Sequence, residues 1–191
     1  FDPHPARFFR PDQPPFQLTS IAERARLMAA FGVDALVVLT FDAPLAALSP
    51  EDFFRQVLVE RLRLKGVVSG YDFTFGKGRS GTTETLQRLA DSHGMASAIV
   101  EPVCVEGDEA VSSTLIRSKL AEGDVTAAAR LLGRWWGIEG TVEGGDQRGR
   151  PIGFPTANVS LGDYARPRYG VYAVRVTLPG GQVAEGVANI G

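Results

Sequence analysis

Apolar residues at helical spacing alternate with short apolar runs over the first two thirds of the chain. Ser20 and Glu23 form a capping box, apolar residues then recur every three or four positions, and Gly32 ends the segment. Residues 35–39 follow as a run of β-forming residues that predicts a buried strand. The same pattern predicts further helices over residues 50–65, 83–93, 113–120 and 125–132, and strands over residues 67–69 and 96–103.

This alternation indicates the fold class of the first part of the chain. Strands separated by helices of about a dozen residues favour a parallel sheet with helices on both faces, the doubly wound α/β class. After Gly133 the sequence has glycines, prolines and short alternating segments at 171–178 and 182–188, without a helical window. We therefore expect an α/β domain over residues 1–133 and an all-β domain, a small β-barrel, over residues 134–191, with the boundary within 132–136.

The composition argues against a nucleic-acid-binding, membrane-spanning or disulfide-bonded protein. The chain has 191 residues, 44% of them hydrophobic and 22% charged, and a formal net charge of -2, which favours a soluble protein without a nucleic-acid partner. No apolar run approaches the roughly 20 residues that span a bilayer, so no membrane partner is expected. The single Cys104 excludes an intramolecular disulfide and suits a reducing compartment. The composition therefore favours a cytoplasmic protein.

The stretch GRPIGFPTAN over residues 149–158 combines backbone donors with oxygen ligands. Gly149 and Gly153 allow backbone amides to surround an anion, and Arg150 adds a guanidinium that can pair with phosphate oxygens. Thr156 and Asn158 offer a hydroxyl and an amide oxygen, ligands that Mg2+ accepts beside water and phosphate. The stretch therefore suits a nucleotide phosphate with its metal, and its spacing alone equally allows a glycine-rich hairpin that closes a barrel.

A second candidate phosphate site lies at the start of the helix predicted after residue 112. In the segment SSTLIR, Ser113 and Thr114 fall at the helix start and Arg117 one turn later. Free amides and the positive end of the helix dipole attract anions there, and the arginine can reach the same phosphate. The alternative interpretation is an ordinary helix cap beside a solvated arginine.

Aromatic residues gather in the loop GYDFTFGKGRSG over residues 70–81. The loop combines the aromatic residues Tyr71, Phe73 and Phe75 with two cations and four glycines, so it could stack a planar ring or, alternatively, its aromatic residues could fill the core below it. His4, between two prolines, could donate to a phosphate or fix its own loop.

These motifs resemble those of one bacterial enzyme family. Residues 149–158 look like the ATP and Mg2+ loop of riboflavin kinases, and residues 169–174 resemble the strand that follows it there. The sequences FDPHP at residues 1–5, GYDFTFGKGRSG and SSTLIR resemble the adenylyltransferase module of the bifunctional riboflavin kinase/FMN adenylyltransferase family, the FAD synthetases. The resemblance spans nearly the whole chain.

The resemblance implies a nucleotidyltransferase domain with a doubly wound sheet, followed by a kinase β-barrel. It implies FAD biosynthesis, in which riboflavin is phosphorylated to FMN by ATP with Mg2+ and FMN is adenylylated to FAD with release of pyrophosphate. The catalytic residues would then be Thr156, Asn158 and Arg117, with Thr156 and Asn158 on the metal. The implied ATP and phosphate contacts are Ser113, Thr114, Arg117, Gly149, Arg150, Gly153 and Thr156, and the implied flavin contacts are His4, Asp72, Phe73 and Phe75.

Two parts of the family pattern do not occur in the sequence. The adenylyltransferase motif HxGH is absent, and the kinase glutamate of the family would lie on a strand after residue 191. We therefore expect an internal fragment with incomplete barrel and sites. Two alternatives stay open: a flavin- or nucleotide-binding module without turnover, and a different nucleotidyltransferase fused to a structural barrel.

Overall fold

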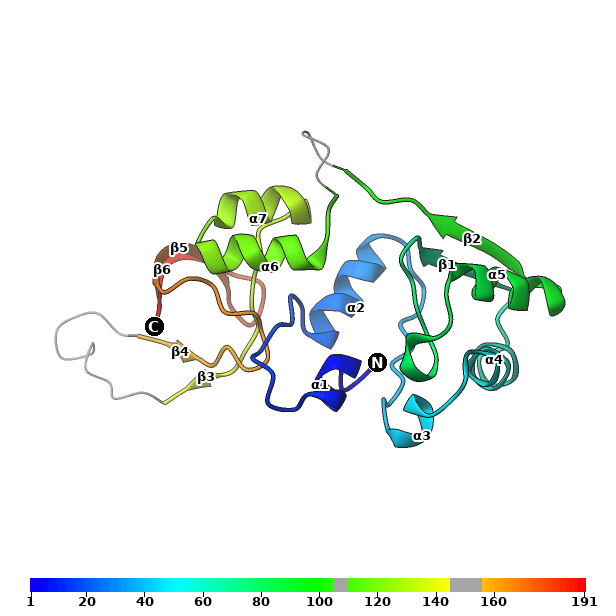
Figure 1. Ribbon diagram of the computed structural model, residues 1–191. Coiled ribbons are helices and arrows are strands. Elements are labelled where there is room, and N and C mark those ends of the chain that lie inside the picture. The colour runs from blue at the N-terminus through cyan, green and yellow to red at the C-terminus, as the bar shows by residue number, and fades with distance from the viewer. Residues whose placement is uncertain (105–109, 145–155) are drawn as a thin grey trace. The chain divides into compact units, whose positions relative to one another are not determined.

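The structure is a computed structural model that describes residues 1–104, 110–144 and 156–191 (Figure 1). The chain forms two compact units. Unit 1 contains Phe1–Gln13 and Val37–Ala110, and unit 2 contains Pro14–Leu36 and Val111–Gly191. Each unit is therefore built from two separate stretches of sequence.

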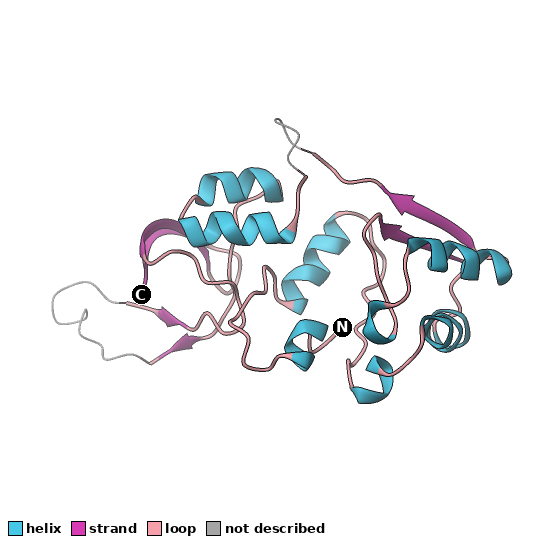
Figure 2. Cartoon of the chain, in the orientation of Figure 1, coloured by secondary structure: helices cyan, strands magenta, loops and turns pink. Residues whose placement is uncertain are grey.

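Unit 1 contains a parallel strand pair joined by a helix (Figure 2). Strands β1 and β2 run in register from Gly66↔Ala96 to Gly70↔Val100, and α5 connects them. Parallel strands need such a crossover, because the chain must return to the same end of the sheet. The elements are α1 (Pro5–Phe9), α3 (Ala43–Ala46), α4 (Pro50–Asp52), the π-helix η1 (Phe53–Arg61), β1 (Gly66–Gly70), the 3-10 helix η2 (Lys77–Arg79), α5 (Thr83–Ser92) and β2 (Ala96–Val100).

The core of unit 1 forms around the apolar face of α5. Leu86, Leu89 and Ala90 are three and four residues apart, so they lie on one face of the helix, and all three are buried. Phe54 of η1 is fully buried in the same cluster, and Phe75 joins it from the loop after β1. The core therefore fixes one side of that loop.

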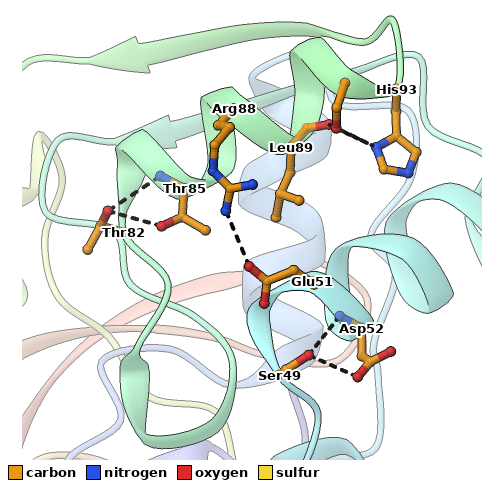
Figure 3. Close-up of polar contacts among 9 residues, drawn as sticks. Ser49, Glu51, Asp52, Thr82, Thr85, Arg88, Leu89 and His93 are labelled. Atoms are coloured by element: carbon orange, nitrogen blue, oxygen red, sulfur yellow. Dashed lines mark hydrogen bonds and ion pairs between the residues drawn. The ribbon is translucent and has the colours of Figure 1, made fainter.

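Polar contacts fix the ends of the helices in unit 1 (Figure 3). Thr82 caps α5, because its hydroxyl accepts from the backbone N–H of Thr85, and Ser49 caps α4 in the same way. An ion pair of 3.2 Å between Arg88 and Glu51 joins α5 to α4. These contacts hold both helices beside the loop over residues 70–81.

Among its described residues, unit 2 combines three helices with antiparallel strand pairs. Strand β3 pairs with β4 over Val142↔Val159 and Glu143↔Asn158, and β5 pairs with β6 from Gly170↔Ile190 to Thr177↔Val183. The elements are α2 (Ile21–Ala30), α6 (Ser113–Glu122), α7 (Val125–Leu132), β3 (Val142–Glu143), β4 (Asn158–Val159), β5 (Gly170–Thr177) and β6 (Val183–Ile190).

The core of unit 2 lies between α6, α7 and the segment before β5. Ile116 and Leu120 of α6 are buried with Ala128 of α7 and Ala165. Gly123 lets the chain turn between the two helices, since its φ of 84° is in the left-handed region. This turn brings the apolar faces of α6 and α7 together.

The stretch Pro14–Leu36 is held in unit 2 by backbone and side-chain hydrogen bonds. The N–H of Gln17 donates to the carbonyl of Asp163 at 2.9 Å, and the N–H of Ala165 donates to the carbonyl of Gln17 at 2.8 Å. The indole N–H of Trp136 donates to the carbonyl of Leu18 at 3.0 Å. Residues more than a hundred positions apart in the sequence are therefore in contact.

The structure confirms a mixed helix and sheet fold and most of the predicted helices. Ser20 caps α2, as predicted, and Thr82 and Ser112 cap α5 and α6 directly before the predicted starts of these helices. Within the described ranges the named strands form three separate two-stranded sheets. No helix in those ranges is long and apolar enough to cross a membrane. The domain boundary expected within residues 132–136 stays a prediction.

Two expectations about unit 1 and its neighbouring segment were wrong, and one short helix was not predicted. Residues 35–39 form no regular strand and are mostly exposed, because the described pairing in this region is a single bridge between Asp2 and Thr40. Residues 5–9, for which the sequence pattern predicted no element, form α1 because His4 caps it and Pro5 suits the first turn. The helix predicted over 50–65 ends at Arg61, since Arg63 takes a left-handed φ of 52°.

Candidate functional site

The N-terminus of α6 presents a set of polar groups at the surface. The hydroxyl of Ser112 accepts from the backbone N–H of Leu115 at 3.1 Å. Ser113 and Thr114 occupy the first turn with exposed side chains, as the sequence predicts. The first N–H groups of a helix have no partner inside it, so this end can accept an anion.

Arg117, one turn into α6, is held by Phe16. Its Nε donates to the backbone carbonyl of Phe16 at 2.6 Å, and its Cζ lies 5.4 Å from the centre of the Phe16 ring. Partial burial lowers the pKa of Arg117, because desolvation disfavours the charged form. The guanidinium still carries its charge, and its terminal nitrogens stay free to bind an anion because the described residues supply no carboxylate partner.

The β3–β4 hairpin carries the residues expected to bind metal. Asn158 begins β4 and lies opposite Glu143 of β3, and both are exposed, as is Thr156. Residues at positions i and i+2 of an extended segment point to one side, so the two oxygen ligands can face the same ligand. Their hydroxyl and amide oxygens fit Mg2+ with phosphate and water as further ligands.

Part of the expected nucleotide loop lies outside the described residues. Gly149, Arg150 and Gly153 belong to this part, so their roles stay predictions. Among the described residues there is no group of three or more His, Cys, Asp or Glu side chains that could hold a metal ion. A metal at Thr156 and Asn158 would therefore depend on substrate phosphates and water for its remaining ligands.

In the loop over residues 70–81, one aromatic residue lies in the core and another lies at the surface. Phe75 is 7% exposed and packs in the core, with its ring 5.9 Å from that of Phe53. Phe73 stacks on Phe75 at 5.6 Å and is 38% exposed. Asp72 is exposed beside them. The core-filling interpretation therefore describes Phe75, whereas Phe73 and Asp72 are accessible to a ligand.

His4 has a structural contact in unit 1. Its Nδ1 accepts from the backbone N–H of Ala6 at 3.1 Å and so caps α1. The residue is exposed, and its expected contact with a flavin stays a prediction. The imidazole thus fixes the turn that follows Pro3, the local role that the sequence left open.

The candidate residues divide between the two compact units. His4, Asp72, Phe73 and Phe75 belong to unit 1, and the residues Ser113, Thr114, Arg117, Thr156 and Asn158 belong to unit 2. Unit 2 therefore contains both described sets of expected phosphate ligands, and unit 1 contains the expected flavin contacts.

Sequence reasoning missed Phe16 as the partner of Arg117. The two residues are 101 positions apart, and nothing in the local pattern of either segment links them. The capping box predicted for Ser20 and Glu23 is half present: the Ser20 hydroxyl accepts from the Glu23 N–H, but the Glu23 carboxylate pairs with Arg134 at 3.1 Å, a partner that the sequence did not indicate. An aromatic ring next to two prolines was the only local signal at Phe16.

Comparison with known proteins places these residues in a family. The model of the FAD synthetase family matches residues 1–115, which is more than half of the chain. The chain belongs to the FAD synthetase family. A second model, for riboflavin kinase, matches residues 132–191, so the two matches cover both parts of the chain.

Similar curated proteins carry both names. The chain is 41% identical over 191 residues to the bifunctional riboflavin kinase/FMN adenylyltransferase of Escherichia coli K12, and 40% identical over 193 residues to that of Bacillus subtilis 168. All of the chain is covered in both comparisons, against 61% and 60% of the two relatives. The chain therefore spans about three fifths of their length.

A solved structure has a similar fold. A crystal structure from Streptococcus pneumoniae, named a macrolide-efflux protein, matches with a TM-score of 0.76 and 35% identity. The match covers 91% of this chain and 55% of that one. Its name concerns a different activity, while the family models and the curated relatives agree on flavin chemistry.

Proposed function

We propose that the full-length protein makes FAD in two ATP-dependent steps. Riboflavin is first phosphorylated to FMN, and FMN is then adenylylated to FAD. The observation that carries the proposal is the α6 N-terminus with Arg117, a partly buried cation beside a helix start, in a chain matched by both family models. The curated relatives, which bear the names of both activities, support it.

In the first step, the 5'-hydroxyl of riboflavin attacks the γ-phosphorus of ATP, and ADP leaves. Thr156 and Asn158 would hold Mg2+ through their oxygen atoms, and the metal would neutralise phosphate charge when bound. Both side chains are exposed at the β3–β4 hairpin, where a nucleotide can reach them. Catalysis then rests on alignment and charge neutralisation, since phosphoryl transfer needs little covalent help from the protein.

In the second step, a phosphate oxygen of FMN attacks the α-phosphorus of ATP. The bond between the α-phosphorus and its bridging oxygen breaks, and pyrophosphate leaves with that oxygen. Ser113, Thr114 and the amides of the first turn of α6 would bind the departing phosphates, and Arg117 would offset their charge. Asp72 and Phe73, which are accessible in the loop after β1, would contact the flavin.

The proposed function also implies how the strands divide into two domains. We infer that β1 and β2 belong to a doubly wound nucleotidyltransferase sheet and that β3 to β6 belong to a kinase β-barrel, with a boundary within residues 132–136. The parallel β1–α5–β2 unit and the antiparallel pairs after residue 140 support this assignment. The cytoplasmic location stays a prediction from the single cysteine.

Two single substitutions in the full-length protein test the division of labour. Arg117→Ala should lower the rate of FAD formation from FMN by about 100-fold, the scale of losing one charge-stabilising group, and leave riboflavin phosphorylation within twofold. Asn158→Ala should lower riboflavin phosphorylation by a similar factor and spare FMN adenylylation. Both rates are read by chromatography of the fluorescent flavins.

The two activities of these variants and of the wild type distinguish the proposed function from its alternatives. Equal loss of both activities in Arg117→Ala would contradict two separate sites, and a normal kinase rate in Asn158→Ala would remove its metal role. Binding of FMN and MgATP by calorimetry without any product in the wild type would instead support a binding module. Adenylylation of an acceptor other than FMN would support a different nucleotidyltransferase.

A further inference from the structure

We propose that Phe16 is a positioning residue for adenylyl transfer, because its ring and backbone carbonyl hold the Arg117 guanidinium on one side and leave its outer N–H groups for the phosphates of ATP. This inference rests on the proposed function of the α6 site. It assigns a task to a residue that lies 101 positions before Arg117 and outside every motif of the sequence.

Phe16 contacts the Arg117 guanidinium at one edge and on one face. Nε donates to the Phe16 carbonyl at 2.6 Å, a short distance for a charge-assisted hydrogen bond, and the ring centre lies 5.4 Å from Cζ, within the range of a cation–π contact. A guanidinium has five N–H donors, so the bond to Phe16 leaves four on the two terminal nitrogens. Those donors form the fork that binds two phosphate oxygens.

The partners of Arg117 differ from those of two other arginines in unit 2, Arg134 and Arg26. Arg134 pairs with the carboxylate of Glu23 and Arg26 pairs with that of Glu139, whereas the described partners of Arg117 are a neutral carbonyl and a neutral ring. A carboxylate would neutralise the guanidinium and compete with phosphate. The neutral partners fix its position and leave its charge uncompensated, which suits a site that must attract an anion.

Phe16 is itself held in place by its neighbours. Gln17, the next residue, exchanges backbone hydrogen bonds with Asp163 and Ala165, and the carbonyl of Leu18 accepts from the indole of Trp136. These bonds fix the backbone on the C-terminal side of Phe16. The carbonyl and ring that contact Arg117 are therefore part of a rigid support, as a preorganised anion site requires.

The test compares Phe16→Leu, Phe16→Tyr and the wild type in the full-length protein. Phe16→Leu keeps the backbone carbonyl and the apolar bulk and removes the ring, whereas Phe16→Tyr keeps an aromatic face. We expect Phe16→Leu to lower kcat/KM for ATP in FMN adenylylation by about threefold to thirtyfold, the range of a cation–π contact. Phe16→Tyr should retain the wild-type value, and riboflavin phosphorylation by the same polypeptides should stay unchanged.

A double-mutant cycle separates positioning from general destabilisation. If Phe16 acts through Arg117, Phe16→Leu should have no further effect on adenylylation in an Arg117→Ala background. An equal penalty in both backgrounds, or a wild-type kcat/KM for Phe16→Leu, would overturn the inference. Should Phe16→Leu fail to fold, Phe16→Met supports the same cycle.

The same experiment distinguishes this inference from the function on which it rests. A wild-type protein that forms no FAD from FMN and ATP would overturn the proposed function. A wild-type protein that forms FAD, together with a Phe16→Leu penalty that does not depend on Arg117, would overturn only the role of Phe16.

Discussion

Removal of Arg134 should destabilise unit 2 more than removal of its partner, Glu23. Glu23 is only 9% exposed, one of its oxygens pairs with Arg134 at 3.1 Å, and its other oxygen is buried without a hydrogen-bond partner among the described residues. Arg134→Ala leaves this carboxylate buried and unpaired. Breaking a buried pair in this way costs about 3–5 kcal/mol, and we expect about 2–3 kcal/mol because the Arg134 side chain is 27% exposed and water reaches the pair.

Removing the charge of Glu23 instead leaves Arg134, a group that water can reach. Glu23→Gln removes the charge, keeps an amide oxygen that can accept from Arg134, and leaves Arg134 partly hydrated, so we expect a loss of about 1 kcal/mol. The double variant should be more stable than Arg134→Ala alone, because no charge is then buried without a partner. This order of stabilities follows from the unequal burial of the two side chains.

Urea unfolding followed by tryptophan fluorescence measures these differences. The chain has two tryptophans, Trp135 and Trp136, and both belong to unit 2, so their emission reports on the unit that contains the pair. Arg26→Ala is the matched control, since Arg26 lies on the same helix as Glu23 and its ion pair with Glu139 is 60% and 43% exposed. The control should lose about 0–1 kcal/mol. An Arg134→Ala loss no larger than that of Arg26→Ala, or smaller than that of Glu23→Gln, would refute the reasoning.

Two further predictions concern unit 1. Gly81→Ala should cost about 1–3 kcal/mol in urea unfolding, because a Cβ there would lie 2.8 Å from the ring of Phe75, and Gly70→Ala is the control because a Cβ there makes only an ordinary contact. The pKa of Asp52 is lowered, and the hydrogen bond from Ser49 is the largest cause. Ionised Asp52 therefore stabilises the folded state above its unfolded-state pKa. This stabilisation is lost as the pH falls through the lower pKa of the folded state. The difference in unfolding free energy between the wild type and Asp52→Asn should therefore shrink as the pH falls below about 4, and a difference that stays constant in an acid titration would contradict this.

Local signals in the sequence predicted the helix ends well. Ser20, Thr82 and Ser112 cap their helices because a hydroxyl and the N–H three residues later are set by the local chain, without help from the rest of the fold. Gly123, directly after α6, has the positive φ that favours glycine at the end of a helix. These features depend on a few neighbouring residues, so they can be predicted from the local sequence.

Features that depend on distant partners could not be predicted. Residues 35–39 have the composition of a buried strand, but a strand also needs neighbours along its length, and only a bridge at Thr40 is present in the described part of the chain. The support of Arg117 by Phe16 likewise arises from tertiary contacts, since it joins two segments through the backbone pairs at Gln17. The candidate ligands were predicted from the motifs, whereas the groups that hold one of them in place required the structure.

The central claim is that one polypeptide carries two ATP-dependent flavin-modifying sites. The most direct measurement incubates the full-length protein with riboflavin and MgATP and quantifies flavins, ADP and pyrophosphate over time. The account predicts that FMN appears first and FAD second, with one ADP and one pyrophosphate formed for each FAD. Formation of FMN without FAD, or of neither product at saturating substrate, would contradict it.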